Sequence, residues 1–171
     1  MKFVIGRALT ILSWDNPVTA FFRKSRKLRH SLGRPSRSDF VQWVFCKHKE
    51  RDTFEVPGGH REAGENTLET AKRELQEETG AIKFDIKPVC VYSVTGKTRV
   101  NDTGEESFGG LYFAEISEFA KELHSEMEKV VLMDELPDNS TYPLIQPKLI
   151  EKYLQIERQT YSKIQLAQSK L

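Results

Sequence analysis

Residues 54–81 read FEVPGGHREAGENTLETAKRELQEETGA, and this stretch predicts a short strand, a glycine turn and a helix. We expect the helix to run from Thr67 to Thr79, because Asn66 and Glu69 have the spacing of a capping box and Gly80 suits the residue after a helix. One face of this helix can pack against a sheet, because its apolar residues recur at helical spacing. These residues are Leu68, Ala71 and Leu75.

The same helix carries a second face made of three glutamates. Glu74, Glu77 and Glu78 stand at i, i+3 and i+4, so their carboxylates project on one side. Like charges at this spacing destabilise an isolated helix by about 0.2–0.5 kcal/mol per pair, and a hard cation such as Mg²⁺ would offset the repulsion. Acidic triplets are also common on solvated helices, so the neighbouring residues decide between the two interpretations. Three of them stand at fixed offsets from the triplet: Gly59, Glu65 and Arg73.

Residues 59–81 resemble the signature of the Nudix hydrolase family, G-x5-E-x7-R-E-U-x-E-E-x-G-U, in which U is a bulky aliphatic residue. Every polar and glycine position of the signature is met, and only Ala81 is smaller than the usual residue. The resemblance implies an α+β fold, namely an α/β/α sandwich with a mixed β-sheet, the Nudix loop-helix-loop and a C-terminal helix. A weaker family pattern of strands and helices extends over roughly residues 40–155.

The resemblance also implies a role for each matching residue. The metal, Mg²⁺ or Mn²⁺, would be bound by one main-chain carbonyl and three carboxylates: Gly59, Glu74, Glu77 and Glu78. Arg73 would hold Glu74 by a charge-assisted pair, and Glu65 would brace the loop without binding the metal itself. Glu74, or an acid from a later loop, would deprotonate or orient the attacking water. Such a site needs no covalent nucleophile, because the metal and the carboxylates activate and position water.

A further catalytic acid is expected from a loop outside the signature. Residues 125–137 look like the family's E-x-x-E-V segment running into D-E-L-P. Within it, Glu126 is the first choice and Glu128 the second, although both could equally be exposed loop acids. Glu105 and Glu106, in an expected hairpin loop, are the competitors.

Outside the signature, the pattern of residues predicts strands and one late helix. The helix is expected over Gln146–Gln168, with Leu149, Ile150, Tyr153, Leu154 and Ile164 on its apolar face. Glycine pairs predict a turn at Gly58-Gly59 and a bulge at Gly109-Gly110, and Pro88 suits an edge or a bulge. Residues 15–38 are expected to be irregular. The expected strands are Lys2–Val4, Ala8–Trp14, Phe40–Cys46, Phe54–Val56, Phe84–Val94, Ser107–Ile116 and Lys129–Met133.

The composition is that of a soluble globular chain. Its 171 residues are 38% hydrophobic and 30% charged, and a net charge of +1 gives no global attraction to nucleic acid or membrane. Cys46 and Cys90 have neither metal nor disulfide spacing, so we expect small core residues in a reducing compartment. No signal peptide is recognisable, and no run approaches the roughly 20 apolar residues of a membrane helix. The sequence therefore predicts a cytoplasmic protein without membrane contact.

We expect the first 38 residues to form an N-terminal extension, either part of the same domain or appended to it, and the resemblance implies that residues 39–171 form the Nudix hydrolase domain. The segment Arg23–Arg37 is strongly basic, and no acid occurs from 16 to 38. Such a run is usually a solvated face, and nucleic-acid binding through it is the less favoured interpretation. ADP-ribose hydrolases of the family commonly carry N-terminal strands that make a dimer, which leaves a homodimer open.

The resemblance outside the signature points to MutT-like hydrolases, which cleave a nucleoside triphosphate to the monophosphate and pyrophosphate. Tyr142-Pro143 stands where members that act on oxidised purines have an aromatic residue that stacks on the base. Leu144 and Ile145 stand where those members have two acids, which argues against assigning that specificity, and Tyr142 could equally be an ordinary packing residue. Alternative activities are the hydrolysis of ADP-ribose or another nucleoside-diphosphate-X compound and the removal of an RNA 5′ pyrophosphate. A non-catalytic domain that senses a nucleotide is the alternative from another class.

Overall fold

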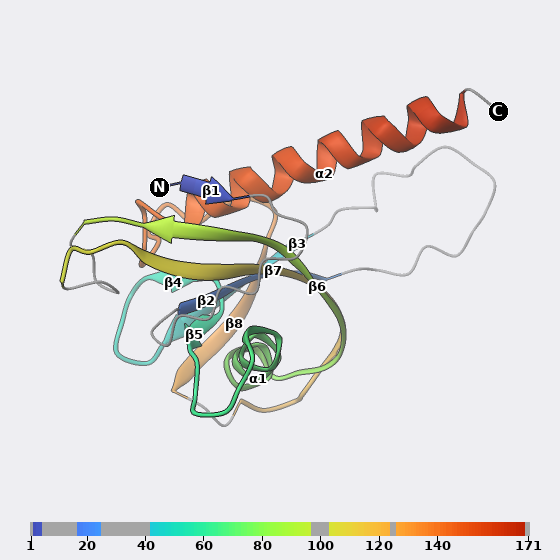
Figure 1. Ribbon diagram of the computed structural model, residues 1–171. Coiled ribbons are helices and arrows are strands. Elements are labelled where there is room, and N and C mark those ends of the chain that lie inside the picture. Colours follow the sequence, from blue (N-terminus) through green and yellow to red (C-terminus); the bar gives the residue numbers. More distant parts are fainter. Residues whose placement is uncertain (1, 5–16, 25–41, 97–102, 124–125, 170–171) are drawn as a thin grey trace.

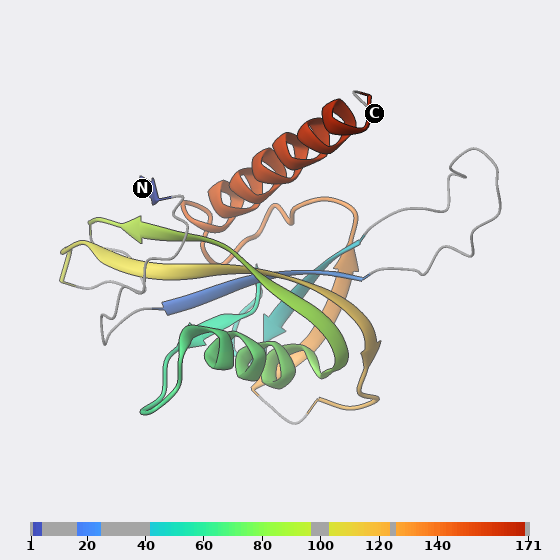
Figure 2. The same ribbon diagram turned by 45° about the vertical axis from the view of Figure 1, so that its right-hand side comes forward.

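The computed structural model describes residues 2–4, 17–24, 42–96, 103–123 and 126–169. Helix α1 (Thr67–Thr79) lies on one side of a mixed sheet and helix α2 (Gln146–Gln168) on the other (Figure 1; Figure 2). This is the α/β/α sandwich that the sequence predicts, and both helices have the predicted bounds. Within the described residues, neither helix is long and apolar enough to cross a membrane.

The described strands form one sheet, whose main path runs β1-β6-β7-β2-β3-β4. Strand β5 pairs with β2, and β8 pairs with β3. The pair β2–β7 is parallel, while the other paired strands are antiparallel. The strands are β1 Lys2–Val4, β2 Pro17–Lys24, β3 Gln42–His48, β4 Phe54–Glu55, β5 Gly58–His60, β6 Ala81–Val94, β7 Ser107–Phe119 and β8 Met127–Met133.

Each helix covers its own apolar cluster on the sheet. Ala71 and Leu75 of α1 pack in one cluster, with Leu68 against it, as the helical spacing predicts. Leu149 and Ile150 of α2 pack in the other. The sheet therefore has an apolar face toward each helix, which fixes α1 and its glutamates relative to the strands.

Strand β2 corrects the expectation that residues 15–38 are irregular. It lies within the sheet, where it pairs with β7 on one edge and with β3 and β5 on the other. A central strand of this kind reads as a continuous apolar run rather than an alternating one, and the letters PVTAFF have that character. The strand is hard to recognise in the sequence because basic residues follow directly on its short apolar run. The expected strand Ala8–Trp14 and the basic residues beyond Lys24 lie outside the described residues.

The two glycine pairs also differ from the prediction. Gly58 and Gly59 lie in β5, where they pair with Thr19 and Val18, instead of forming a turn. The pair Gly109-Gly110 continues the regular ladder with β6. One of the three register shifts in this ladder lies on the β6 side between Pro88 and Cys90, so Pro88 stands at a bulge, as predicted. The bulge forms there because proline has no N–H to give to the ladder.

Helix α2 is apolar toward the sheet only in its first half. Leu149, Ile150 and Tyr153 are buried, and the ring of Tyr153 stacks on that of Phe113 at 4.4 Å between centroids. The helix then continues beyond the sheet (Figure 1), where Ile164 is half exposed. The prediction that Ile164 belongs to the packed face is therefore wrong.

Both ends of α1 have the predicted caps. The side chain of Asn66 accepts hydrogen bonds from the amides of Leu68 and Glu69, both at 3.0 Å, and the carboxylate of Glu69 accepts from the Asn66 amide at 2.8 Å. Gly80 adopts the left-handed conformation, with φ 68°. These caps hold the first and last turns of the helix that carries the glutamates.

We expect Asn66→Ala to lower the free energy of unfolding by about 1 kcal/mol, because two amides of the first turn lose their acceptor. Urea denaturation measured by circular dichroism checks this value. Glu69→Gln is the matched control, since its amide oxygen can still accept from the Asn66 amide. If Asn66→Ala is as stable as the unmodified protein, the cap contributes nothing.

Candidate functional site

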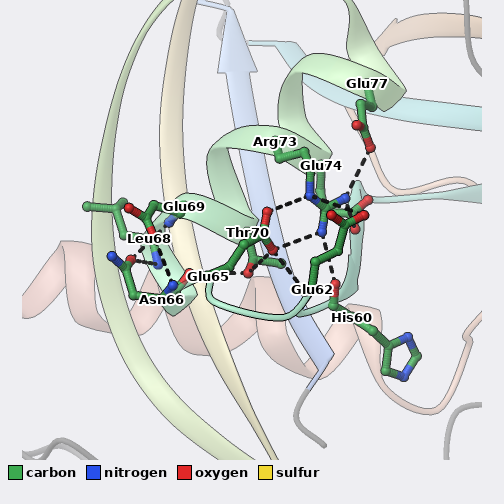
Figure 3. Close-up of polar contacts among 10 residues, drawn as sticks. All are labelled: His60, Glu62, Glu65, Asn66, Leu68, Glu69, Thr70, Arg73, Glu74 and Glu77. Carbon is green, nitrogen blue, oxygen red and sulfur yellow. Dashed lines mark hydrogen bonds and ion pairs between the residues drawn. The ribbon is translucent and has the colours of Figure 1, made fainter. Parts of the chain in front are cut away.

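Arg73, in the middle of α1, is the centre of an ion-pair network (Figure 3). Its Nε and Nη2 donate to the two carboxylate oxygens of Glu65 at 2.7 and 3.1 Å. Its Nη1 donates to Glu74 at 2.9 Å and to Glu77 at 3.1 Å. Nη2 also reaches the carbonyl oxygen of His60 at 3.0 Å. One guanidinium therefore connects β5, the loop before α1 and two of the three helix glutamates.

Glu65 is fixed in this network from several directions. Its carboxylate also accepts from the hydroxyl of Thr70 at 2.8 Å and from the Glu62 amide at 3.0 Å. The hydrogen bonds from Arg73 are the main cause that lowers the pKa of Glu65 to about 2. The hydrogen bond to Glu65, together with the carboxylates of Glu74 and Glu77, raises the pKa of Arg73 above its ordinary value. Glu65 therefore stays ionised at neutral pH and anchors the guanidinium.

The carboxylate of Glu74 lies directly against Gly59. A methyl group added to Gly59 would stand 2.1 Å from Oε1 of Glu74 and 2.4 Å from its Cδ, far inside van der Waals contact. Gly59 is part of an extended strand, so glycine is needed here for space and not for a left-handed backbone. Close contact with Glu74, and not a turn as expected, is therefore the physical reason for a glycine at position 59.

Glu78 is the most buried of the three helix glutamates, with 7% of its surface exposed. Its Oε2 accepts a hydrogen bond from the Gly58 amide at 2.9 Å. Burial is the main cause that raises the pKa of Glu78 to about 9, and the charges of Glu74, Glu55 and Glu126 contribute. Burial also raises the pKa of Glu74, although Arg73 acts against it. The ionised forms of both acids are therefore destabilised where they stand.

A second buried acid lies behind Glu78. Glu55 of β4 is 6% exposed, and Nη1 of Arg51 donates to both of its oxygens at 3.1 and 3.2 Å. Cys46 is fully buried, as predicted for a core residue, and burial raises the pKa of its thiol. This thiol donates to the backbone carbonyl of Glu78 at 3.3 Å. Cys90 is half-buried.

The candidate acids outside α1 lie in different surroundings. Glu126 is exposed, and its charge raises the pKa of both Glu74 and Glu78, which places it beside the helix glutamates. Glu128 instead pairs with Lys47, and this hydrogen bond lowers the pKa of Glu128. Glu106 accepts a hydrogen bond from Ser93 at 2.9 Å in the β6–β7 hairpin. Among these candidates, Glu126 lines the same hollow as Glu77 of the helix, whereas Glu128 is paired with Lys47.

Tyr142 lies in the segment between β8 and α2. Its backbone carbonyl accepts from the amides of Ile145 and Gln146 at 3.1 and 3.0 Å, so it forms the turn that starts α2. Glu105 lies in the β6–β7 hairpin, where its amide donates to Thr103 at 3.2 Å.

The residues of α1 fit a divalent metal by their chemistry. Among the described residues, no three His, Cys, Asp or Glu side chains converge as a ready-made cation site. Arg73 binds Glu74 and Glu77, which keeps these two carboxylates on the guanidinium. However, Glu78 is buried and Glu74 is partly buried, burial raises the pKa of both carboxyl groups, and oxygen donors of this type suit hard cations. A cation would stabilise their ionised forms, so the donor set fits Mg²⁺ or Mn²⁺.

A hollow of about 530 Å³ opens at the C-terminal end of α1. Its walls come from the last turn of α1, the start of β6 and the segment after β7, and they include Glu77, Glu122 and Glu126. No lysine or arginine stands among the described residues that line it. A phosphate group could therefore approach this side of α1 favourably only together with a cation.

Sequence reasoning missed three parts of the site. The Gly58 amide is a backbone group, which no residue pattern reveals. Thr70 is fully buried beneath Glu65, although its position on the apolar side of α1 could have been noticed. Glu55 carried a usable signal, because an acid between Phe54 and Val56 in a strand is rarely buried without a partner.

Known proteins resemble the chain in both sequence and fold. The sequence model of the NUDIX domain matches residues 32–152. The protein named "Putative 8-oxo-dGTP diphosphatase YtkD" from Bacillus subtilis (strain 168) is 36% identical over 99 residues. This alignment covers 57% of the chain and 58% of that relative.

Among solved structures, the pyrophosphohydrolase BsRppH of Bacillus subtilis, in a mutant form, has a TM-score of 0.64 at 24% identity, with 90% of this chain and 89% of that chain covered. A UDP-X diphosphatase also has a TM-score of 0.64, at 17% identity, with 89% and 66% covered. These structural similarities show the fold. The NUDIX match spans more than half of the chain and includes all of α1 with its glutamates, and on this evidence the chain belongs to the Nudix hydrolase family.

Proposed function

We propose that this protein is a Mg²⁺- or Mn²⁺-dependent pyrophosphohydrolase that cleaves a purine nucleoside triphosphate to the monophosphate and pyrophosphate. The observation that carries the proposal is the pair Glu74 and Glu78. These acids lie against adjacent glycines of one strand, and burial raises the pKa of both. Natural proteins retain such destabilised acids where function needs them.

The metal would be held by the carboxylates of Glu74, Glu77 and Glu78 and by the carbonyl of Gly59. When bound, it supplies positive charge for the phosphate oxygens and acidifies a water molecule. Glu65 and Arg73 stay outside this set and fix its geometry, since Arg73 contacts Glu74, Glu77 and the neighbouring carbonyl of His60. Displacing Arg73 from Glu77 would free that exposed carboxylate for the cation.

Glu126 is the best candidate for the acid that orients the attacking water. It is exposed, so water can reach its carboxylate. Its charge raises the pKa of both Glu74 and Glu78, so it lies on the same side of α1 as these two proposed metal ligands. Glu74 remains the second candidate for this role.

The choice of a purine triphosphate rests on the relative from Bacillus subtilis, whose name refers to 8-oxo-dGTP, and on Tyr142. A tyrosine can stack on a base for about 1–3 kcal/mol. Leu144 and Ile145 provide no acid to read an oxidised purine, so the proposal does not name oxidised guanine. Nucleoside-diphosphate-X compounds and RNA 5′ pyrophosphates remain second candidates, and a protein named UDP-X diphosphatase shares the fold. The segment Arg23–Arg37 would favour RNA through phosphate contacts.

A substrate panel tests this function. The protein is incubated with Mg²⁺ and either nucleoside triphosphates, UDP-sugars, ADP-ribose or 5′-triphosphorylated RNA, and the released phosphate and pyrophosphate are measured. We expect pyrophosphate from a purine triphosphate, and we expect Glu78→Gln to lose at least about 100-fold in rate while staying folded. No turnover of any compound would favour the non-catalytic, nucleotide-sensing alternative, and wild-type rates in Glu78→Gln would refute the metal assignment.

Gly59→Ala should lower kcat about 100-fold, because the new methyl group forces the Glu74 carboxylate away from β5. Gly64→Ala is the matched control: its φ is +90°, so alanine is strained there, but no atom lies within 4 Å of the added methyl group. Steady-state kinetics of both variants, with thermal unfolding as a check of folding, separate the two effects. Equal activity losses in both variants would contradict a specific role of Gly59.

The metal-free protein should lose stability as pH rises, because Glu78 has a pKa of about 9 when folded against an ordinary value of 4.5. Below pH 4.5 the group is protonated in both states and contributes nothing. Between pH 4.5 and 9 the unfolded chain releases the proton while the folded chain keeps it, so the free energy of unfolding falls by up to about 1.4 kcal/mol per pH unit. Denaturation in EDTA at several pH values should show a steeper fall for the wild type than for Glu78→Gln; parallel curves would disprove it.

A further inference from the structure

Gln146, the first residue of α2, lies far from the signature in sequence but binds the backbone of Val56, which connects β4 to β5. Its side chain is 5% exposed. The Val56 amide donates to Gln146 Oε1 at 3.3 Å, and Gln146 Nε2 donates to the Val56 carbonyl at 3.5 Å. A carboxamide has one donor and one acceptor side by side, so it can pair with both polar groups of a peptide as a neighbouring strand would.

The backbone between Phe54 and Gly58 has hydrogen-bond partners in three different parts of the chain. Phe54 pairs with the backbone of Asn139 and Thr141 at 3.0 and 2.8 Å. Val56 pairs with the side chain of Gln146, and the Gly58 amide pairs with the carboxylate of Glu78. Gln146 thus supplies the hydrogen bonds for Val56, which lies between Phe54, bound by the segment before α2, and Gly58, bound by Glu78.

The connection from Val56 to Gly58 is short and stiff. Only Pro57 separates them, and its ring fixes φ while its side chain is fully buried. A shift of the Val56 peptide would therefore move Gly58, which binds Glu78, and Gly59, which lies against Glu74. Both contacts are at the proposed metal ligands.

We propose that Gln146 is a positioning residue for the metal site, which holds Val56 so that Gly58 and Gly59 set the places of Glu78 and Glu74. The inference rests on the proposed metal-dependent function. Gln146 also connects the metal ligands of α1 with the segment of Tyr142, because the turn that contains Tyr142 directly precedes Gln146. Groups that orient metal ligands without binding the metal typically change metal affinity 10- to 100-fold when removed.

The test measures Mn²⁺ binding to the full chain in the absence of nucleotide, by calorimetric titration. Gln146→Met keeps the length of the side chain but removes both hydrogen bonds to Val56, and we expect it to weaken Mn²⁺ binding about ten-fold. Thr141→Val is the matched control. It removes the hydrogen bond between Thr141 and Thr53, at 2.7 Å in the same segment, without touching Val56. Its Mn²⁺ affinity should equal that of the wild type.

Urea denaturation of each variant shows that it is folded under the binding conditions. If Gln146→Met does not fold, Gln146→Asn takes its place, since its shorter side chain keeps an amide but cannot reach Val56. Unchanged Mn²⁺ affinity in a folded Gln146 variant overturns the proposal, and so does an equal loss in Thr141→Val, which would indicate general loosening of the segment. A wild-type protein that binds no Mn²⁺ overturns the proposed metal-dependent function itself, so the two failures are distinguishable.

Discussion

The carboxylates of Glu74 and Glu78 lie against adjacent glycines of β5 and are withdrawn from water, Glu78 more than Glu74, and the rest of the site depends on this constraint. Burial and mutual repulsion both disfavour the ionised forms, which is why the pKa of Glu78 rises to about 9. The protein offsets part of the cost with one cation and one backbone donor, Arg73 beside Glu74 and the Gly58 amide beside Glu78. A divalent metal would remove the remainder.

The fold determines how these acids meet the strand. Helix α1 packs through Ala71 and Leu75 on one face of the sheet, which turns the glutamates toward β5. Strand β5 is itself paired with β2, so a segment from before the signature supports the backbone of Gly58 and Gly59. The same geometry explains why a side chain at Gly59 would displace the Glu74 carboxylate, because an added Cβ would lie 2.1 Å from its Oε1.

The site has a common part and a particular part. The ion pairs around Arg73 lie within the signature and hold Glu74 and Glu77, two of the proposed metal ligands. The segment before α2, with Tyr142 and Gln146, lies outside it and is tied to the signature through Val56. Substrate preference is expected to reside in this second part, since the signature residues are the proposed metal ligands and their supports. A link through one side chain would let the two parts keep a fixed relative position.

The sequence by itself determined α1, its caps and the acidic face, because these depend on local spacing and on hydrogen bonds between residues three or four apart. It also determined the family, since the signature is contiguous. It failed for β2, whose apolar run is followed by basic residues and whose pairing with β7 joins positions about ninety residues apart. Tertiary structure alone decided why Gly59 is a glycine, which acid lies beside Glu78, and what holds Val56. Each of these depends on the distance between atoms from separate elements, and that distance exists only once α1, α2 and the sheet have packed together.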